Sequence, residues 1–100
     1  MWILQSADDP AGDSFTFRMA AGAIKTIGRA PRADFVVDAA LVSRLHCRLT
    51  AADDAVAVVD LDSTNGTYIN DQRVQKGSLA SGDRLRVGRV EITIVKQPEA

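Results

Sequence analysis

Apolar and polar residues alternate in short segments along most of this chain. The alternation is clearest over residues 15–19, 84–87 and 90–94, where every second side chain is apolar. A period of two is typical of a β-strand with one face against a core. Turn-forming residues separate such segments, at 8–13 (around Pro10 and Gly12), 21–22, 30–31, 53–54, 65–66, 76–77, 81–83 and 88. Short strands punctuated in this way predict an all-β sandwich or barrel.

One pair of strands is expected to form a tight hairpin. Residues 67–69 and 72–74 flank the dipeptide Asn70-Asp71, which has the length of a two-residue turn. A type I′ turn requires a positive φ at both central residues, and aspartate adopts that conformation less readily than glycine. We therefore expect a hairpin here that is slightly weakened by Asp71.

Residues 38–52 fit two structures. Asp38 is a possible helix cap, and Leu41, Leu45 and Leu49 follow at helical spacing, which predicts an amphipathic helix. The alternative is a loop through residues 43–44 that leads into a strand with Cys47, Leu49 and Ala51 facing inward. Periodicity alone leaves both interpretations open.

Composition describes one ordinary globular domain. The chain has 100 residues, of which 46 % are hydrophobic and 25 % charged, with a net charge of −1. That balance argues against a general nucleic-acid-binding protein, which carries a basic excess. The charge is nevertheless uneven, because residues 25–48 contain five basic and two acidic side chains. This local surplus favours an anionic partner.

Cellular location and metal binding are also constrained. Cys47 is the only cysteine, so the chain forms no internal disulfide and a reducing compartment is expected. No segment has the length and apolarity of a membrane span, and the first ten residues do not resemble a signal peptide. We therefore expect a cytoplasmic protein that neither binds membranes nor uses a cofactor. One cysteine and one histidine cannot make a zinc site of the usual kind, so no metal site is expected.

Two short clusters carry the candidate chemistry. They are Ser43-Arg44-Leu45-His46 and Ser63-Thr64-Asn65-Gly66-Thr67, and the dipeptide Gly28-Arg29 lies upstream of both. Each cluster places small hydroxyl groups beside a turn. A guanidinium, hydroxyls and backbone amides that converge from loops form a receptor for an anion such as phosphate.

The order of these clusters closely resembles the forkhead-associated (FHA) domain, a family that binds phosphothreonine peptides and is not catalytic. The resemblance extends over residues 2–95. Its anchors are Gly28-Arg29, Asp34, Asp38, residues 42–46, Asp60, residues 63–67, Asn70 and Gly82-Asp83. It implies an FHA domain over residues 1–96 followed by a loose tail at 97–100. It also implies two sheets of about eleven short, mostly antiparallel strands with the binding loops at one end, and it favours the loop-and-strand structure for residues 38–52.

The resemblance assigns roles to four residues. Arg29, Ser43 and Thr64 would bind the phosphate, and Asn65 would hold the main chain of the peptide. The chemistry fits, because a guanidinium meets two phosphate oxygens at once and hydroxyls donate to others. The side-chain amide of Asn65 both donates and accepts, so it could bond to the backbone N–H and C=O groups of the peptide as a neighbouring strand does. The partner would be a phosphothreonine-containing protein or peptide, phosphorylated by a serine/threonine protein kinase.

Five further residues are expected to support the site: Gly28, Arg44, His46, Gly66 and Asn70. Gly28 would allow close backbone approach and Arg44 would add charge or a backbone amide. His46 beside Ser43 could be drawn as the base of a small hydrolase, but no third group is evident to orient the ring. In the family this histidine braces the binding loop, so we expect a structural role.

The sequence does not identify the partner. Candidate side chains for reading residues near the phosphothreonine are Arg32, Leu41, Val42 and Arg89. The main alternative function is an FHA-type domain that binds proteins independently of phosphate. Such a domain would have no reason to keep all four of the groups assigned to phosphopeptide binding.

Overall fold

The computed structural model describes residues 1–6 and 14–98, which form eleven β-strands and no helix. The turn expected at residues 8–13 lies outside these residues, as do the last two positions of the expected tail. The strands are β1 (Trp2–Ser6), β2 (Thr16–Met19), β3 (Ile24–Gly28), β4 (Phe35–Val36), β5 (Cys47–Ala51), β6 (Val56–Asp60), β7 (Thr67–Ile69), β8 (Gln72–Val74), β9 (Lys76–Leu79), β10 (Arg84–Val87) and β11 (Val90–Lys96). None of the described segments is a helix able to cross a membrane.

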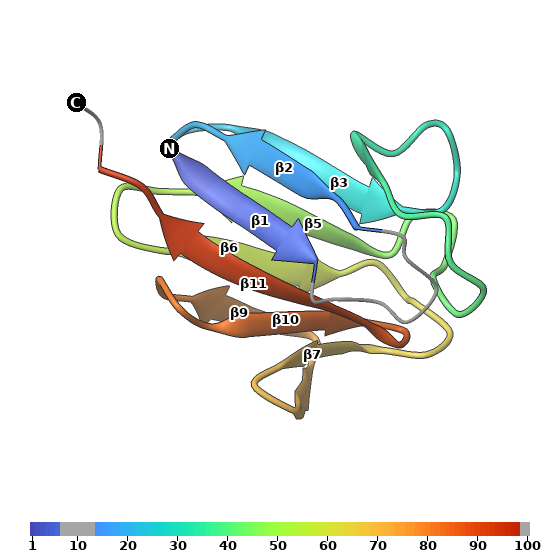
Figure 1. The fold of residues 1–100 in the computed structure, drawn as a ribbon. Coiled ribbons are helices and arrows are strands. Elements are labelled where there is room, and N and C mark those ends of the chain that lie inside the picture. Colours follow the sequence, from blue (N-terminus) through green and yellow to red (C-terminus); the bar gives the residue numbers. More distant parts are fainter. Residues whose placement is uncertain (7–13, 99–100) are drawn as a thin grey trace.

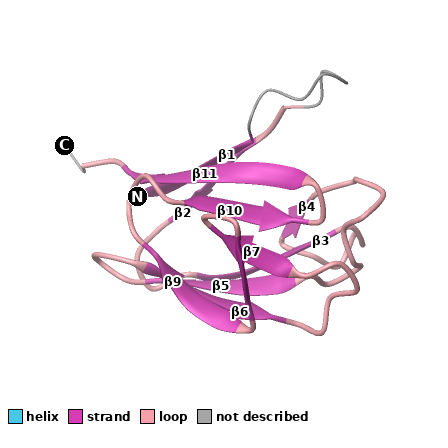
Figure 2. Cartoon of the chain, turned by 90° about the horizontal axis from the view of Figure 1, so that it is seen from below, coloured by secondary structure: helices cyan, strands magenta, loops and turns pink. Residues whose placement is uncertain are grey.

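The strands build two sheets that face each other across the core. One sheet has six strands in the order β2-β1-β11-β10-β7-β8, and the other has five in the order β4-β3-β5-β6-β9. Figure 2 shows β1, β2, β10 and β11 in one layer and β3, β5, β6 and β9 in the other. All pairings are antiparallel apart from the short parallel contact between β3 and β4. The predicted two-sheet sandwich is thus confirmed.

The alternating segments of the sequence are strands with one face in the core. In β10, Leu85 and Val87 are fully buried, whereas Arg84 and Arg86 lie on the outer face. In β11, Ile92 and Ile94 are fully buried in the same way. Apolar side chains drive this arrangement, since burying each one stabilises the fold by about 1.5–3 kcal/mol.

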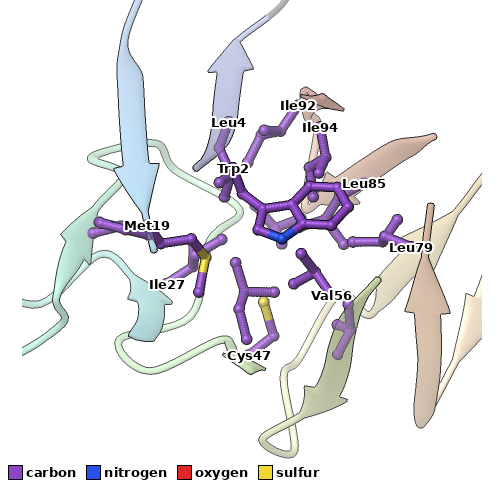
Figure 3. Packing of buried hydrophobic residues seen from close by; sticks show 14 of the residues in the cluster. Trp2, Leu4, Met19, Ile27, Cys47, Val56, Leu79, Leu85, Ile92 and Ile94 are labelled. Atoms are coloured by element: carbon purple, nitrogen blue, oxygen red, sulfur yellow. The ribbon is translucent and has the colours of Figure 1, made fainter. Parts of the chain in front are cut away.

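The core is closed near the chain ends by Trp2. Figure 3 shows its indole among side chains from both sheets, including Met19, Leu79 and Leu85. The ring is 1 % exposed, and its Nε1 donates a hydrogen bond to the carbonyl oxygen of Ala52 at 2.8 Å. That bond satisfies the one polar atom of a large apolar side chain, as a buried tryptophan requires.

The hairpin predicted at residues 67–74 is confirmed. Ile69 pairs with Gln72, and the two residues between them have φ angles of 48° at Asn70 and 70° at Asp71. Both values are in the left-handed region, as in a type I′ turn. Asp71 therefore adopts the conformation that aspartate tolerates less well than glycine.

The helical interpretation of residues 38–52 is wrong. The segment bends through residues 40–45 and then enters β5, where Cys47, Leu49 and Ala51 are buried. Pairing with both β3 and β6 places β5 inside its sheet. Each backbone amide and carbonyl of β5 then gains a neighbour across the sheet, which overrides the leucine spacing. Burial also raises the pKa of the Cys47 thiol to about 12.

Candidate functional site

Three loops meet at one end of the sandwich, opposite the chain termini (Figure 1, right). They follow β3 (residues 29–34), precede β5 (residues 37–46) and connect β6 to β7 (residues 61–66). Residues 43–46 of the first sequence cluster and residues 63–66 of the second lie in two of these loops, and Arg29 begins the loop after β3. The fold therefore brings together segments that are more than thirty residues apart in the sequence.

Arg29 is held at the entrance to its loop by two hydrogen bonds. Its backbone N–H donates to the carbonyl oxygen of Ser43 at 2.9 Å, and its side-chain Nε donates to that of Val42 at 3.2 Å. The residue is exposed, and the terminal guanidinium nitrogens make no hydrogen bond to the part of the chain that the structure describes. The side chain is thus oriented through Nε while its two terminal nitrogens remain available to a ligand.

The base of this loop is closed by Thr26 and Asp34. The carboxylate of Asp34 accepts from the backbone N–H of Thr26 at 2.9 Å and from its hydroxyl at 3.2 Å. The backbone N–H of Asp34 in turn donates to the Thr26 hydroxyl oxygen at 3.1 Å. The backbone hydrogen bond from Thr26 is the main reason that the pKa of Asp34 lies below its usual value. These bonds fix the loop that carries Arg29.

Gly28 permits the backbones of two loops to touch. A Cβ atom at this position would lie 2.0 Å from the carbonyl oxygen of Arg44. The same oxygen accepts a hydrogen bond from the backbone N–H of Ala30 at 3.1 Å. Only glycine fits so close to another backbone. The exposed side chain of Arg44 makes no hydrogen bond to the described residues, so its main-chain oxygen is the part that supports the site.

Ser43 joins the two sequence clusters. Its hydroxyl oxygen accepts a hydrogen bond from the backbone N–H of Thr64 at 3.1 Å. The hydroxyl hydrogen of Ser43 and the exposed side-chain hydroxyl of Thr64 have no partner among residues 1–6 and 14–98. Two hydroxyl donors therefore lie in adjacent loops, and both are free to reach an anion.

Asn65 lies at the tip of the loop between β6 and β7. Its side-chain Nδ2 donates to the carbonyl oxygen of Leu41 at 3.0 Å, across to the other loop. That bond uses one of the amide's donors and leaves the Oδ1 acceptor and a second N–H exposed. Gly66 follows with a φ of +91°, a conformation that allows the loop to turn back into β7.

His46 is fully buried behind these loops. Its Nδ1 accepts from the backbone N–H of Ser43 at 3.0 Å, and its Nε2 donates to the carbonyl oxygen of Gly66 at 2.8 Å. Because the backbone N–H only donates and the carbonyl only accepts, this pair of bonds fits a neutral imidazole with its hydrogen on Nε2. Both nitrogens are bonded to the backbone, and neither is directed at the Ser43 hydroxyl. The ring therefore cannot act as the base of a Ser43–His46 hydrolase in this arrangement.

Asp60 organises the second cluster, a role that the sequence interpretation missed. Its carboxylate accepts from the Ser63 hydroxyl at 2.5 Å, the Ser63 backbone N–H at 3.2 Å and the Thr67 hydroxyl at 2.7 Å. Partial burial works to raise the pKa of Asp60, but the hydrogen bonds from Ser63 and Thr67 hold it below its usual value. The signal in the sequence is an aspartate with serine three residues later, a common turn arrangement.

The remaining candidates differ in their positions. Val42 is 2 % exposed and lies in the core, so the expectation that its side chain reads the ligand is wrong. Leu41 is half-buried, and Arg32 and Arg89 are exposed. Asn70 lies beyond the far end of β7, away from the two clusters. There its side chain bonds to Asp83 at 3.2 Å and to the backbone N–H of Arg84 at 3.0 Å.

Comparison with known proteins identifies relatives over most of the chain. The oxoglutarate dehydrogenase inhibitor of Corynebacterium diphtheriae is 36 % identical over 75 residues, which is 75 % of this chain and 52 % of that protein. The glycogen accumulation regulator GarA of Mycobacterium tuberculosis is 35 % identical over 77 residues, 77 % of this chain and 48 % of GarA. This chain thus spans about half the length of these curated relatives.

A solved structure with the same architecture comes from a study of phosphothreonine-dependent FHA domain interactions. It is 35 % identical, covers 98 % of both chains and has a TM-score of 0.81. The family model of the FHA domain matches residues 25–88, a range that contains all three loops of the candidate site. A match over more than half of the sequence, together with relatives above 30 % identity, shows that this protein belongs to the FHA-domain family.

Proposed function

We propose that this protein is a binding module that recognises phosphothreonine on partner proteins in serine/threonine-kinase signalling and performs no catalysis. The hydrogen bond between Thr64 and Ser43 carries the proposal, because it brings two free hydroxyl donors into adjacent loops. Arg29 lies at the start of the loop after β3, with its terminal nitrogens unused by the described residues.

The chemistry of these groups matches a phosphate dianion. Arg29 supplies a planar pair of donors that can meet two phosphate oxygens, while the hydroxyls of Ser43 and Thr64 donate to the others. Phosphothreonine carries about −1.5 to −2 charges near neutral pH, so these hydrogen bonds are charge-assisted. All three residues belong to loops fixed by backbone hydrogen bonds, which lowers the entropy cost of binding.

Asn65 would hold the peptide main chain. Its exposed Oδ1 accepts and its second N–H donates, which matches the alternating groups of an extended backbone. The bond to Leu41 orients the amide before any ligand arrives.

The relatives support this assignment. The solved FHA structure at 35 % identity comes from work on phosphothreonine-dependent interactions. The FHA domain of FhaA, which is 36 % identical to this chain, has been solved in complex with the intracellular domain of another protein. We extend the same mode of binding to this chain and place it in the cytoplasm, where kinase substrates are available and the single thiol stays reduced.

A shallow loop surface with a few charge-assisted bonds should bind peptides at about micromolar Kd, or ~−8 kcal/mol. Burial of the threonine methyl group would favour phosphothreonine over phosphoserine by about 0.8 kcal/mol. Loss of Arg29 leaves the phosphate partly unpaired and should weaken binding by about 2–5 kcal/mol.

The test is fluorescence polarisation with three degenerate peptide libraries that carry phosphothreonine, phosphoserine or unmodified threonine at the fixed position. The variant Arg29→Ala should lose the signal, and Arg18→Ala should keep it. Arg18 is an exposed arginine on β2, outside the three loops, so it controls for the change in net charge. The proposal is supported if binding is limited to the phosphorylated libraries and is lost in Arg29→Ala but not in Arg18→Ala.

Equal binding to all three libraries, or none by a folded protein, would overturn it. The phosphate-independent scaffold of the same fold would then be the better description. Circular dichroism of the original protein and of each variant establishes that all of them are folded.

A further inference from the structure

The outer face of the six-stranded sheet carries a row of charged and aromatic residues across its β8 side. Strand register places Tyr68 opposite Arg73 on one side and opposite Arg86 on the other, and Arg86 is opposite Glu91. The guanidinium of Arg86 lies over the ring of Tyr68, 3.9 Å from its centroid. Because neighbours in one register row share a face, these side chains all point away from the core.

Only part of the positive charge on this face is neutralised. Arg84 pairs with Glu91 at 3.2 Å and with Asp71 at 3.5 Å. Arg86 forms no ion pair with a described residue and donates from Nη1 to the carbonyl oxygen of Gly88 at 3.2 Å. Arg73 is exposed and makes neither an ion pair nor a hydrogen bond within residues 1–6 and 14–98. Two guanidinium groups therefore flank Tyr68 without a carboxylate partner in the part of the chain that the structure describes.

This face is continuous with the candidate site. A Cβ atom at Gly66 would lie 2.8 Å from Nε of Arg73 and 3.2 Å from the edge of the Tyr68 ring. The guanidinium of Arg73 thus lies against the turn that begins with Asn65. A peptide whose main chain is held at Asn65 would have flanking residues within reach of Arg73, and further residues near Arg86.

We propose that Arg73, Tyr68 and Arg86 form a second contact surface that binds an acidic segment flanking the phosphothreonine of the same partner. The inference rests on the proposed function, since it needs a phosphopeptide anchored at the loops. Charge complementarity selects the occupant: carboxylates pair with the two guanidinium groups, and the aromatic ring packs against aliphatic stems. This surface would make the module selective for phosphothreonine sites in acidic sequence.

Exposed ion pairs contribute little each and weaken with salt. Two such pairs should raise affinity by about threefold to tenfold at low ionic strength and by less at high salt. The effect should be additive with phosphate binding, because the acidic segment and the phosphate contact different side chains.

The experiment measures Kd by fluorescence polarisation for a phosphothreonine library with an oligoglutamate or an oligoglutamine extension, placed on either side. The variants are Arg73→Gln and the double change Arg73→Gln with Arg86→Gln. Arg73→Gln removes no ion pair or hydrogen bond within the described residues, so it tests the surface even if the double variant is less stable. The matched control is Arg48→Gln with Lys76→Gln, two exposed residues in one register row on the other sheet.

We expect the oligoglutamate extension to improve Kd on at least one side, and the gain to disappear in the double variant but persist in the control. Equal affinity for both extensions, or a gain that survives the double change, would overturn the inference while leaving phosphothreonine binding intact. A folded protein that binds neither phosphorylated library would overturn the proposed function and this inference together.

Discussion

The Nε2 atom of His46 donates a hydrogen bond to the carbonyl oxygen of Gly66 across 2.8 Å, within the interior of the protein. The other ring nitrogen accepts from the backbone of Ser43. One buried imidazole therefore links the two loops that carry the candidate phosphate-binding hydroxyls. The site depends on a residue that is enclosed in the protein and does not face the ligand.

His46→Ala should destabilise the protein by about 3 kcal/mol, because it leaves two buried backbone groups unpaired and opens a cavity. Urea unfolding monitored by tryptophan fluorescence measures the change. His46→Asn keeps an acceptor near the position of Nδ1 and should cost less. If the free energy of unfolding fell by less than about 1 kcal/mol in His46→Ala, or fell equally in both variants, the two hydrogen bonds would not be what holds these loops together.

Gly28→Ala should be severely destabilising, at about 3 kcal/mol or more, because the added methyl group would lie 2.0 Å from the backbone of Arg44. Backbone cannot move aside as a flexible side chain can. The matched control is Gly22→Ala: nothing lies within 4 Å of its Cβ position, but its φ is +90°. That change should cost about 1 kcal/mol from backbone strain alone. The measurement is the melting temperature of each variant. A lower melting temperature for Gly22→Ala than for Gly28→Ala would contradict this account.

Asp71→Gly should stabilise the protein by about 0.5–1 kcal/mol, because glycine adopts the observed φ of 70° without strain. The exposed ion pair to Arg84 that it removes contributes little. Asn70→Gly at the adjacent position should destabilise by about 1 kcal/mol, since its side chain makes two hydrogen bonds. Equal effects of the two changes on the melting temperature would argue against a strained hairpin.

Stability should fall in acid, in part through Asp60. The pKa of Asp60 is lower in the folded protein than the usual value of an aspartate in an unfolded chain. Its contribution is therefore fully present above the unfolded pKa and is lost as the pH falls through the folded pKa. Asp60→Asn should cost about 2 kcal/mol at neutral pH, because the amide replaces an acceptor of hydrogen bonds with a donor.

The measurement is the free energy of unfolding in urea at a series of pH values from neutral to acid. The Asp60→Asn protein should show a shallower loss of stability below about pH 4 than the original protein. Asp34→Asn is the comparison, because the pKa of Asp34 is also lowered and its carboxylate closes a different loop. An unchanged slope in Asp60→Asn would show that its hydrogen bonds contribute no acid sensitivity.

Local pattern was sufficient to predict much of the fold. Alternation over residues 84–87 and 90–94 identified strands whose buried faces are those observed, because side-chain direction in a strand depends only on the period of two. Asn70-Asp71 predicted its own turn, since the φ requirement of a type I′ turn is local. The order of Arg29, Ser43 and Asn65 along the chain was enough to indicate the family.

Other features were settled only by contacts between distant segments. Residues 38–52 have apolar residues at helical spacing. Residues 47–51 nevertheless form strand β5, because β3 and β6 supply hydrogen-bond partners on both sides of it. Val42 is an apolar residue in a loop of the candidate site, yet its side chain enters the core. The place of Arg73 beside Gly66 follows from the register of β7 and β8 and from the absence of a side chain at the glycine.

The sequence by itself thus determined that the alternating segments form strands, where the tight turn lies and which polar groups supply the candidate chemistry. Those properties follow from the side chain and its immediate neighbours along the chain. The tertiary structure decided which loops meet, which apolar residues are buried and which arginines have no partner among the described residues. These depend on burial and on backbone hydrogen bonds between segments far apart in sequence, such as the bond from Thr64 to Ser43.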